Sequence, residues 1–457
     1  MSRLFGTDGV RGVANRELTP ELALRIGRAA ASLLPDETEP RPVIVGRDTR
    51  VSGTMLEAAI VAGITSVGRD AVSVGIVPTP AIACITRAED AAAGVVISAS
   101  HNPIADNGIK FFGSDGFKLS DRLEDEIEAL LDSDALARPT GTAVGMARVA
   151  QNLARHYYAE LYDGHPDLRG LRVVVDGGFG AAYAIAPYAL RKLGADVTEI
   201  NCDNDGARIN VQCGATNLQA LQDEVRTENS GRAKRRAIGV AFDGDADRAL
   251  FVDETGAVAT GDHVMFALGR AMHAQGELRG DTIVGTVMSN IGVERALRGH
   301  GIALLRTPVG DRYVLEQMRE GDYTLGGEQS GHVVDFRYNT TGDGPRTAVT
   351  LLALMAAEGA TLHELVREVV IAPQVLLNVR TGNREVLAAP AVREEIAAAE
   401  AALDGSGRLL IRPSGTEPLI RVMAEGDDHA FVTALASRVA ARIEQEAERA
   451  GAGRPSD

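Results

Sequence analysis

The chain has 457 residues, and at roughly 150 residues per domain this length predicts about three domains, with two or four also admissible. Hydrophobic residues make up 45% and charged residues 24%, with only 17 prolines, which excludes wholesale disorder and collagen-like repeats. The net charge of −16 excludes a surface that attracts phosphate generally, and 4% aromatics without tryptophan exclude base-stacking platforms. We therefore expect no nucleic-acid partner, and a local basic site for any bound phosphate.

Neither the cysteines nor the hydropathy indicates an exported or membrane protein. The three cysteines, Cys84, Cys202 and Cys213, are an odd number without paired metal-ligand spacing, which predicts reduced thiols. The longest uncharged stretch, 71–86, contains two prolines and is shorter than the ~20 apolar residues of a membrane helix. The first dozen residues are charged and lack the apolar core of a signal peptide. We expect a cytoplasmic protein with no membrane partner.

Short β-branched runs alternate with helical periodicity in the first part of the chain. The expected elements are a helix at 21–33, a strand at 43–45, a helix at 53–67, and strands at 72–74 and 95–97. Buried strands separated by helices predict βαβ units and a parallel or mixed sheet covered on both faces. We place this first domain at 1–148 and expect its last strand to lead into a polar loop at Ser98–Pro103.

The same alternation returns twice. For a second domain, 149–254, we expect helices at 153–161, 180–193 and 218–225, and strands at 173–175 and 238–242. For a third domain, 255–371, we expect strands at 283–286, 303–306 and 323–325. In each of these three predicted domains a strand ends in a polar loop, and α/β sheets place their ligand sites at such strand ends.

The remainder, 372–457, has a different pattern. The expected elements are strands at 375–379, 408–411 and 419–424, with helices at 390–403 and 429–449. Strands flanking a tight loop, with helices on one side, predict a smaller α+β domain. The predicted fold class is therefore α/β, with three similar mixed-sheet domains followed by a smaller C-terminal α+β domain.

The first polar loop contains Ser100 at a strand end, before an Asn-Pro turn. A serine alone is a poor nucleophile, and it needs a base, a metal or prior modification. His101 and Lys110 offer donors nearby, and the segment 106–110 follows the loop. A polar turn with only local hydrogen bonds is the better explanation of the loop when it is considered alone.

The second loop carries Asp243, Asp245 and Asp247, followed by Arg248. Three carboxylates at alternate positions can turn toward one hard cation, and ligation by oxygen alone suits Mg²⁺. A solvated acidic turn is the simpler alternative, but the place after an apolar strand favours a metal loop. The spacing also resembles a Ca²⁺ loop, although the rest of an EF-hand pattern is missing.

Two further loops have the chemistry of sugar and phosphate sites. The loop 326–332, which includes Glu328, Ser330 and His332, mixes donors and acceptors as sugar hydroxyls require, though a generic turn would also fit. The loop 412–418 and the strand after it offer guanidinium groups, hydroxyls and a glycine, which is the inventory of a phosphate site. Its residues are Arg412, Ser414, Gly415, Thr416 and Arg421. An ion pair with Glu417 or Glu425 would explain one arginine but not the hydroxyls.

These loops together resemble those of the α-D-phosphohexomutases, and most closely the bacterial phosphoglucosamine mutase branch of that superfamily. The resemblance covers nearly the whole chain in the right order. It is carried by the segments 4–12, 98–103 with 106–112, 243–248, 307–314, 326–332 and 412–422. The segment 206–210 and the pair Thr216–Asn217 depart from the expected pattern, and the basic loop 227–237 is longer than usual, with a role that the pattern leaves open.

The resemblance implies four domains around a central cleft and an isomerase that converts glucosamine 6-phosphate to glucosamine 1-phosphate for UDP-N-acetylglucosamine synthesis. Ser100 would be the phosphorylated serine, and a 1,6-bisphosphate of the hexosamine or hexose would be intermediate and activator. One Mg²⁺ would be held by Ser100, Asp243, Asp245 and Asp247. The remaining implied roles are catalytic for His101, Lys110, Arg248 and His332, sugar-binding for Glu328 and Ser330, phosphate-binding for Arg412, Ser414, Gly415, Thr416 and Arg421, and cleft-lining for Arg11, Thr307 and Gly310.

Several alternatives stay open at this point. A mutase for glucose or mannose phosphates would use the same loops. An aspartate-nucleophile phosphatase also presents acidic residues after a strand, but it would not need Ser100, and a non-catalytic sugar-phosphate sensor would not need three carboxylates. The expected partner is a small-molecule sugar phosphate, and a homodimer is left open.

Overall fold

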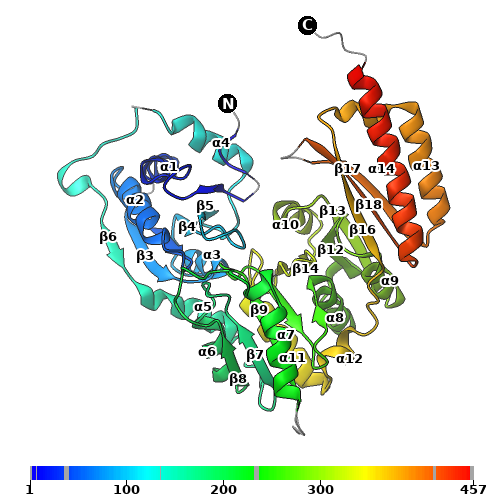
Figure 1. Cartoon of the computed structure of the whole chain (residues 1–457). Coiled ribbons are helices and arrows are strands. Elements are labelled where there is room, and N and C mark those ends of the chain that lie inside the picture. The colour runs from blue at the N-terminus through cyan, green and yellow to red at the C-terminus, as the bar shows by residue number, and fades with distance from the viewer. Residues whose placement is uncertain are drawn as a thin grey trace. The chain divides into compact units, whose positions relative to one another are not determined.

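The computed structural model describes residues 3–6, 8–34, 41–133, 135–230, 236–414 and 418–452 (Figure 1). They form two compact units. One consists of Met1–Thr286 and Ile302–Arg367, and the other of Val287–Gly301 and Glu368–Asp457. No helix among the described residues is long and apolar enough to cross a membrane.

The first sheet has six strands in the order β1-β5-β4-β2-β3-β6. Its side chains alternate between two cores: Val43 and Val45 face α1 and α2, while Ile44 packs with residues of α3 and α5. This alternation follows from the two-residue period of a strand. The elements are β1 (Val10–Val13), α1 (Pro20–Ser32), β2 (Val43–Arg47), α2 (Gly53–Thr65), β3 (Ala71–Ile76), α3 (Thr79–Ala88), β4 (Ala93–Ile97), β5 (Asp106–Gly113), α4 (Asp121–Leu130) and β6 (Ala147–Val149).

The second sheet has five strands in the order β11-β10-β9-β7-β8. Strands β7, β8 and β9 are parallel, and β10 then returns antiparallel to β9, with Phe242 opposite Ala249. The loop 243–248 is therefore the connection of a hairpin. The elements are α5 (Arg155–Leu161), β7 (Arg172–Asp176), α6 (Ile185–Lys192), β8 (Asp196–Ile200), α7 (Gln219–Asn229), β9 (Ala237–Phe242), β10 (Ala249–Val252) and β11 (Val258–Ala259).

The third sheet has four strands in the order β13-β12-β14-β15. Strand β12 pairs in parallel with β13 and β14, and β14 continues through the loop 328–332 into antiparallel β15. The elements are α8 (Gly261–Gln275), β12 (Thr282–Thr286), β13 (Ala303–Thr307), α10 (Asp311–Glu320), β14 (Leu325–Gly327), β15 (Val333–Asp335), α11 (Gly344–Glu358) and α12 (Leu362–Val366).

The second unit has an antiparallel sheet in the order β16-β18-β17. Its core lies between the sheet and two helices, where Val422 and Val379 pack with Leu435 and Val439. Helix α9 joins it because Ile291 N–H donates to the buried Glu425 carboxylate at 3.1 Å. The elements are α9 (Ile291–Gly299), β16 (Gln374–Arg380), α13 (Pro390–Leu403), β17 (Gly407–Pro413), β18 (Leu419–Gly426) and α14 (His429–Ala452).

The predicted fold class is confirmed, with three α/β domains and a smaller C-terminal domain, but three local details differ. The residues 106–110, for which no strand was predicted, begin β5, which pairs with both β1 and β4. The helix expected at 180–193 begins only at Ile185, since Ala181 N–H donates to Gly244 O at 2.8 Å instead. The strand expected at 323–325 begins at Leu325. The predicted domain boundaries stay a prediction.

Candidate active site

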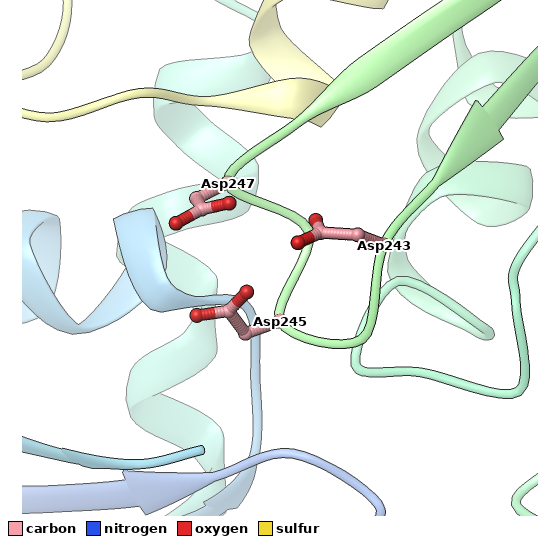
Figure 2. Close-up of side chains that lie close together, drawn as sticks. All are labelled: Asp243, Asp245 and Asp247. Atoms are coloured by element: carbon pink, nitrogen blue, oxygen red, sulfur yellow. The ribbon is translucent and has the colours of Figure 1, made fainter. Parts of the chain in front are cut away.

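The acidic loop between β9 and β10 is buried and tightly built. Ala246 lies in the left-handed backbone region, with φ of 56°, which costs a non-glycine residue roughly 1 to 2 kcal/mol. Two backbone hydrogen bonds hold it there: Ala246 N–H donates to Asp243 O at 3.1 Å, and Gly344 N–H donates to Ala246 O at 3.0 Å. The turn brings the carboxylates of Asp243, Asp245 and Asp247 together, with one oxygen of each within 4.8 Å of the others (Figure 2).

The three carboxylates differ in their electrostatic surroundings. Burial, followed by the negative charges of Asp247 and Asp245, raises the pKa of Asp243 well above its ordinary value. Although burial opposes it, Lys110 and a hydrogen bond from Thr79 lower the pKa of Asp245 to about 2. Asp245 Oδ1 and Asp247 Oδ1 are buried and have no hydrogen-bond partner among the described residues. Unpaired buried carboxylate oxygens are unfavourable without a cation, so the cluster is suited to a metal ion.

Ser100 lies directly against this cluster. Its hydroxyl donates to Asp243 Oδ2 at 2.6 Å, and the residue is 1% exposed. Its backbone has a φ of 51°, and its N–H donates to Ser98 Oγ at 2.9 Å. His101 lies beside it, with Nδ1 3.3 Å from Ser100 Oγ. The predicted serine and the predicted metal loop, 143 residues apart in the chain, therefore meet.

Basic side chains surround the acidic cluster. Lys110, 2% exposed on β5, has its ammonium 3.0 Å from Asp8, 3.2 Å from Asp245 and 3.7 Å from Asp247. These carboxylates raise the pKa of Lys110 despite its burial, so it stays charged. Arg248 Nε lies 3.8 Å from Asp247 Oδ1. Arg11 forms an ion pair with Asp8.

The predicted sugar loop is organised around Glu328. One carboxylate oxygen accepts a hydrogen bond from Gly310 N–H at 3.1 Å, and the other accepts one from Ser330 Oγ at 3.3 Å. Thr307 directs its hydroxyl to the backbone carbonyl of Gly285 instead. Glu328 thus contacts both Gly310 and Ser330, whereas the Thr307 hydroxyl donates to backbone carbonyls.

His332, at the end of the same loop, is buried, and its ring nitrogens can still form hydrogen bonds with a ligand. It is 2% exposed, and neither ring nitrogen has a hydrogen-bond partner among the described residues. Asp311 Oδ2 lies 3.6 Å from Nε2. An imidazole held in this way can exchange a proton with a ligand.

In the second unit, the antiparallel register of β17 and β18 places Arg412 directly opposite Arg421. Burial and the charge of Arg421 lower the pKa of Arg412. Ser414 O accepts a hydrogen bond from Arg384 at 2.9 Å. The predicted ligands Gly415 and Thr416, and the alternative partner Glu417, lie outside the described residues.

The other alternative partner, Glu425, forms its ion pair with Arg408 at 2.8 Å. Arg412 and Arg421 thus place two guanidinium groups at opposed positions of neighbouring strands.

Several residues of the site were not predicted. Thr79, the first residue of α3, donates through its hydroxyl to Asp245 Oδ2 at 2.6 Å, and its N–H donates to Asp245 O at 2.9 Å. Asp8 joins Lys110 to Lys118, whose Nζ lies 2.6 Å from Asp8 Oδ1 and also contacts Asp311. The sequence signals were the position of Thr79 between two prolines after a strand and the position of Asp8 within the segment 4–12, which carries the family resemblance.

Comparison with known proteins gives the family. The chain matches the phosphoglucomutase/phosphomannomutase family in four segments: α/β/α domain I at residues 2–138, domain II at 156–256, domain III at 260–371 and the C-terminal domain at 376–442. It is 50% identical over 457 residues to a phosphoglucosamine mutase of Desulforudis audaxviator, covering 99% of this chain and 100% of that protein.

Solved structures agree in fold. A phosphoglucomutase/phosphomannomutase family protein of Burkholderia thailandensis superposes with a TM-score of 0.82 at 24% identity, covering 98% of each chain. The N-acetylphosphoglucosamine mutase of Aspergillus fumigatus, solved with GlcNAc-6P and magnesium, has a TM-score of 0.65 at 18% identity and covers 97% of this chain and 96% of its own. With the full-length sequence match and the serine set against an acidic cluster, the chain belongs to the phosphoglucosamine mutases of the phosphoglucomutase/phosphomannomutase family.

Proposed function

We propose that the protein interconverts glucosamine 6-phosphate and glucosamine 1-phosphate by transferring a phosphoryl group through Ser100. The observation that carries this proposal is the contact between the Ser100 hydroxyl and Asp243, at 2.6 Å, within a cluster of three buried carboxylates. The substrate is inferred from the relatives, which are phosphoglucosamine mutases at about half identity over the whole chain. A serine needs a base, a metal or prior modification to take part in such a transfer.

The metal of this site would be one Mg²⁺, held by Asp243, Asp245, Asp247 and an oxygen on Ser100. An all-oxygen donor set suits this ion, and the unpaired oxygens of Asp245 and Asp247 support the fit. When bound, the ion would neutralise charge on the transferring phosphoryl group. Lys110 and Arg248, both within 4 Å of these aspartates, would add positive charge on the same side.

The proposed reaction begins with phosphorylated Ser100. The bond between phosphorus and Ser100 Oγ breaks while the C1 hydroxyl oxygen of glucosamine 6-phosphate bonds to phosphorus. The hydroxyl proton passes by way of His332 to the released Ser100 Oγ. The product is a 1,6-bisphosphate, which turns end over end and returns its 6-phosphoryl group to Ser100. Such transfers depend mainly on positioning and charge neutralisation.

Two further groups would bind the sugar phosphate. Glu328 and Ser330 would contact sugar hydroxyls, since both present polar atoms from a loop fixed by Gly310. The phosphate that is not reacting would be held by Arg412, Ser414, Gly415, Thr416 and Arg421. Guanidinium groups carry several N–H donors for phosphate oxygens, which suits a substrate that binds in two directions.

A coupled assay for glucosamine 1-phosphate, run beside an assay for inorganic phosphate, tests the proposal. We expect mutase turnover with little phosphate release, one phosphate on Ser100 by peptide mass, and nearly complete loss in Ser100→Ala. Ser66→Ala, which removes a hydroxyl that only bonds to Gly63 O, is the control. Net phosphate release would indicate a phosphatase. Faster turnover of glucose or mannose 6-phosphate would change the substrate but keep the chemistry.

A further inference from the structure

The carbonyl oxygen of Ser100 is held by two side chains from different parts of the chain. Arg50 Nη2 donates to it at 2.8 Å, and Asn210 Nδ2 also donates at 2.8 Å. Ser100 has a left-handed backbone, with φ of 51°, which costs a serine roughly 1 to 3 kcal/mol unless its surroundings impose it. These two donors supply such surroundings.

Arg50 is the centre of the loop that carries Ser100. It is 1% exposed, and its Nε donates to the buried carboxylate of Asp48 at 3.0 Å. Its two terminal nitrogens donate to four backbone carbonyls of the loop, at 2.6 to 3.0 Å: those of Ser100, Asn102, Pro103 and Asp106. Because a guanidinium group is planar and rigid, these bonds fix the path of the loop.

Asn210 reaches the same carbonyl from the second domain. It belongs to the segment 206–210, which departs from the expected family pattern. Its N–H donates to Gly178 O at 3.0 Å. At the start of this segment, a Cβ atom on Gly206 would lie 1.8 Å from Thr49 O. The segment is therefore pressed against the residues next to Arg50.

The acidic loop packs against the same carbonyl oxygen of Ser100. A Cβ atom on Gly244, between Asp243 and Asp245, would lie 2.5 Å from Ser100 O and 2.9 Å from Asn210 Nδ2. The Ser100 carbonyl is thus where the serine loop, the acidic loop and the segment 206–210 meet. The Ser100 N–H donates to Ser98 Oγ, so hydrogen bonds hold the peptide groups on both sides of Ser100. The side-chain torsion χ1 is the rotation that these backbone contacts leave open.

We infer that Arg50 and Asn210 are positioning residues for phosphoryl transfer, which hold the Ser100 peptide so that Oγ faces Asp243. Arg50 shapes the loop, and Asn210 ties it to the domain that bears the acidic cluster. The inference rests on the proposed function, in which Ser100 carries the phosphoryl group. Small displacements of a reacting atom lower the rate strongly without weakening substrate binding.

Asn210→Asp is the sharpest test. Aspartate has the same shape as asparagine, tolerates the positive φ of residue 210, and replaces the N–H donor with an acceptor. The matched control is Asn229→Asp. Asn229 also donates to two backbone carbonyls, Ala237 O at 2.8 Å and Glu254 O at 3.1 Å, but at the opposite end of β9 from the acidic loop.

We expect kcat of Asn210→Asp to fall at least tenfold, with KM for glucosamine 6-phosphate within twofold of wild type. The control should stay within twofold in both constants at a similar change in thermal midpoint. Asn210→Gly, which removes the donor without adding charge and accepts the same φ, should lower kcat in the same direction. If kcat stays within twofold of wild type in both Asn210 variants, the inference is wrong.

A second measurement separates this inference from the proposed function. Amide hydrogen exchange in the peptide 98–110 should be faster in Asn210→Asp than in wild type or Asn229→Asp, and this readout needs no turnover. Unchanged exchange would overturn the positioning role even in an active enzyme. If wild type itself makes no glucosamine 1-phosphate, the proposed function fails, and the exchange experiment still decides whether Asn210 holds the Ser100 loop.

Discussion

The acidic loop 243–248 and the arginine pair of β17 and β18 balance their charge in opposite ways. The aspartates are buried beside an equally buried Lys110 and have Arg248 at 3.8 Å. Arg412 and Arg421 are partly exposed, and they face each other across two strands as like charges. Like charges directly opposite in a sheet are destabilising.

The difference indicates how each cluster serves a ligand. The acidic cluster is assembled with its own counter-cations, so a metal ion would complete an existing arrangement. The arginine pair places two like charges at opposed positions, so a bound anion would reduce the repulsion between them. Substitutions in the two clusters should therefore change stability with opposite signs.

The largest effect is expected for Asp245→Asn. It removes one proposed metal ligand and the partner of Thr79 and Lys110, so we expect kcat to fall roughly a thousandfold, or about 4 kcal/mol. Steady-state assays across a Mg²⁺ titration measure it. Added Mg²⁺ should not restore the rate, whereas Mg²⁺ should fully restore chelated wild type.

Asp253→Asn is the matched control for that experiment. Asp253 is a buried aspartate of the same domain whose carboxylate accepts the Thr255 and Ala257 N–H groups, and asparagine keeps an acceptor oxygen. Near-wild-type turnover of Asp245→Asn, or full activity of wild type in excess chelator, would show that the acidic cluster does not hold a required metal.

Lys110→Met tests whether the acidic cluster depends on its built-in cation. Leaving buried carboxylates without their partner typically costs about 3 to 5 kcal/mol, so the free energy of unfolding should fall by that order without metal. Denaturant unfolding with and without Mg²⁺ measures it. Mg²⁺ should stabilise the variant more than wild type, since binding to the folded state raises stability. Equal stabilisation of both proteins would contradict the idea that the lysine stands in for cation charge.

Arg412→Ala and Arg421→Ala should each have a moderate kinetic effect, and Arg412→Ala should also have the opposite effect on stability. Losing a charge-assisted hydrogen bond to phosphate should cost about 1.5 to 3 kcal/mol, or roughly one to two decades in kcat/KM. Because Arg412→Ala removes one of two opposed like charges, its thermal midpoint should stay equal or rise. Arg393→Ala on the exposed side of α13 is the control. A lower midpoint with unchanged kcat/KM would mean that the pair is structural.

The smallest effect concerns Glu160, a largely buried carboxylate that lies 3.6 Å from Arg87 and is also influenced by the charge of Arg346. Burial, followed by the charge of Asp343, raises its pKa from 4.5 to about 7. The folded state therefore holds this proton more tightly than the unfolded state. Below pH 4.5 the group contributes no pH dependence, and between pH 4.5 and 7 the free energy of unfolding should fall by about 1 to 3 kcal/mol.

Glu160→Gln should flatten this part of the stability profile, measured by denaturant unfolding at several pH values. Exposed Glu320→Gln is the control. A variant whose stability still falls like that of wild type over this range would show that another group is responsible. Flattening would mean that burial outweighs the nearby arginines at Glu160, unlike in the acidic cluster, where Lys110 and Thr79 outweigh burial at Asp245.

Local patterns in the sequence were enough for most of the framework. The β-branched runs predicted β2, β4, β7 and β9, and the C-terminal pattern predicted α13 and the pair β17 and β18. Apolar periodicity is a local property, and it reports burial directly. It failed at β5, where a polar Asp-Asn-Gly start resembles a turn, because pairing on both sides supplies hydrogen bonds that no local pattern reveals.

The same division holds for the site. The residue types and their positions in the sequence indicated the serine, the three aspartates and the two arginines, because their chemistry is unusual at strand ends. Only the tertiary structure decided that Ser100 meets Asp243, that Lys110 is enclosed by Asp8 and Asp245, and that Arg412 opposes Arg421. The supporting residues, Thr79, Arg50 and Asn210, are ordinary in type and distant in sequence. Their roles arise from contacts that exist only after folding, because hydrogen bonds depend on distance and direction rather than on order along the chain.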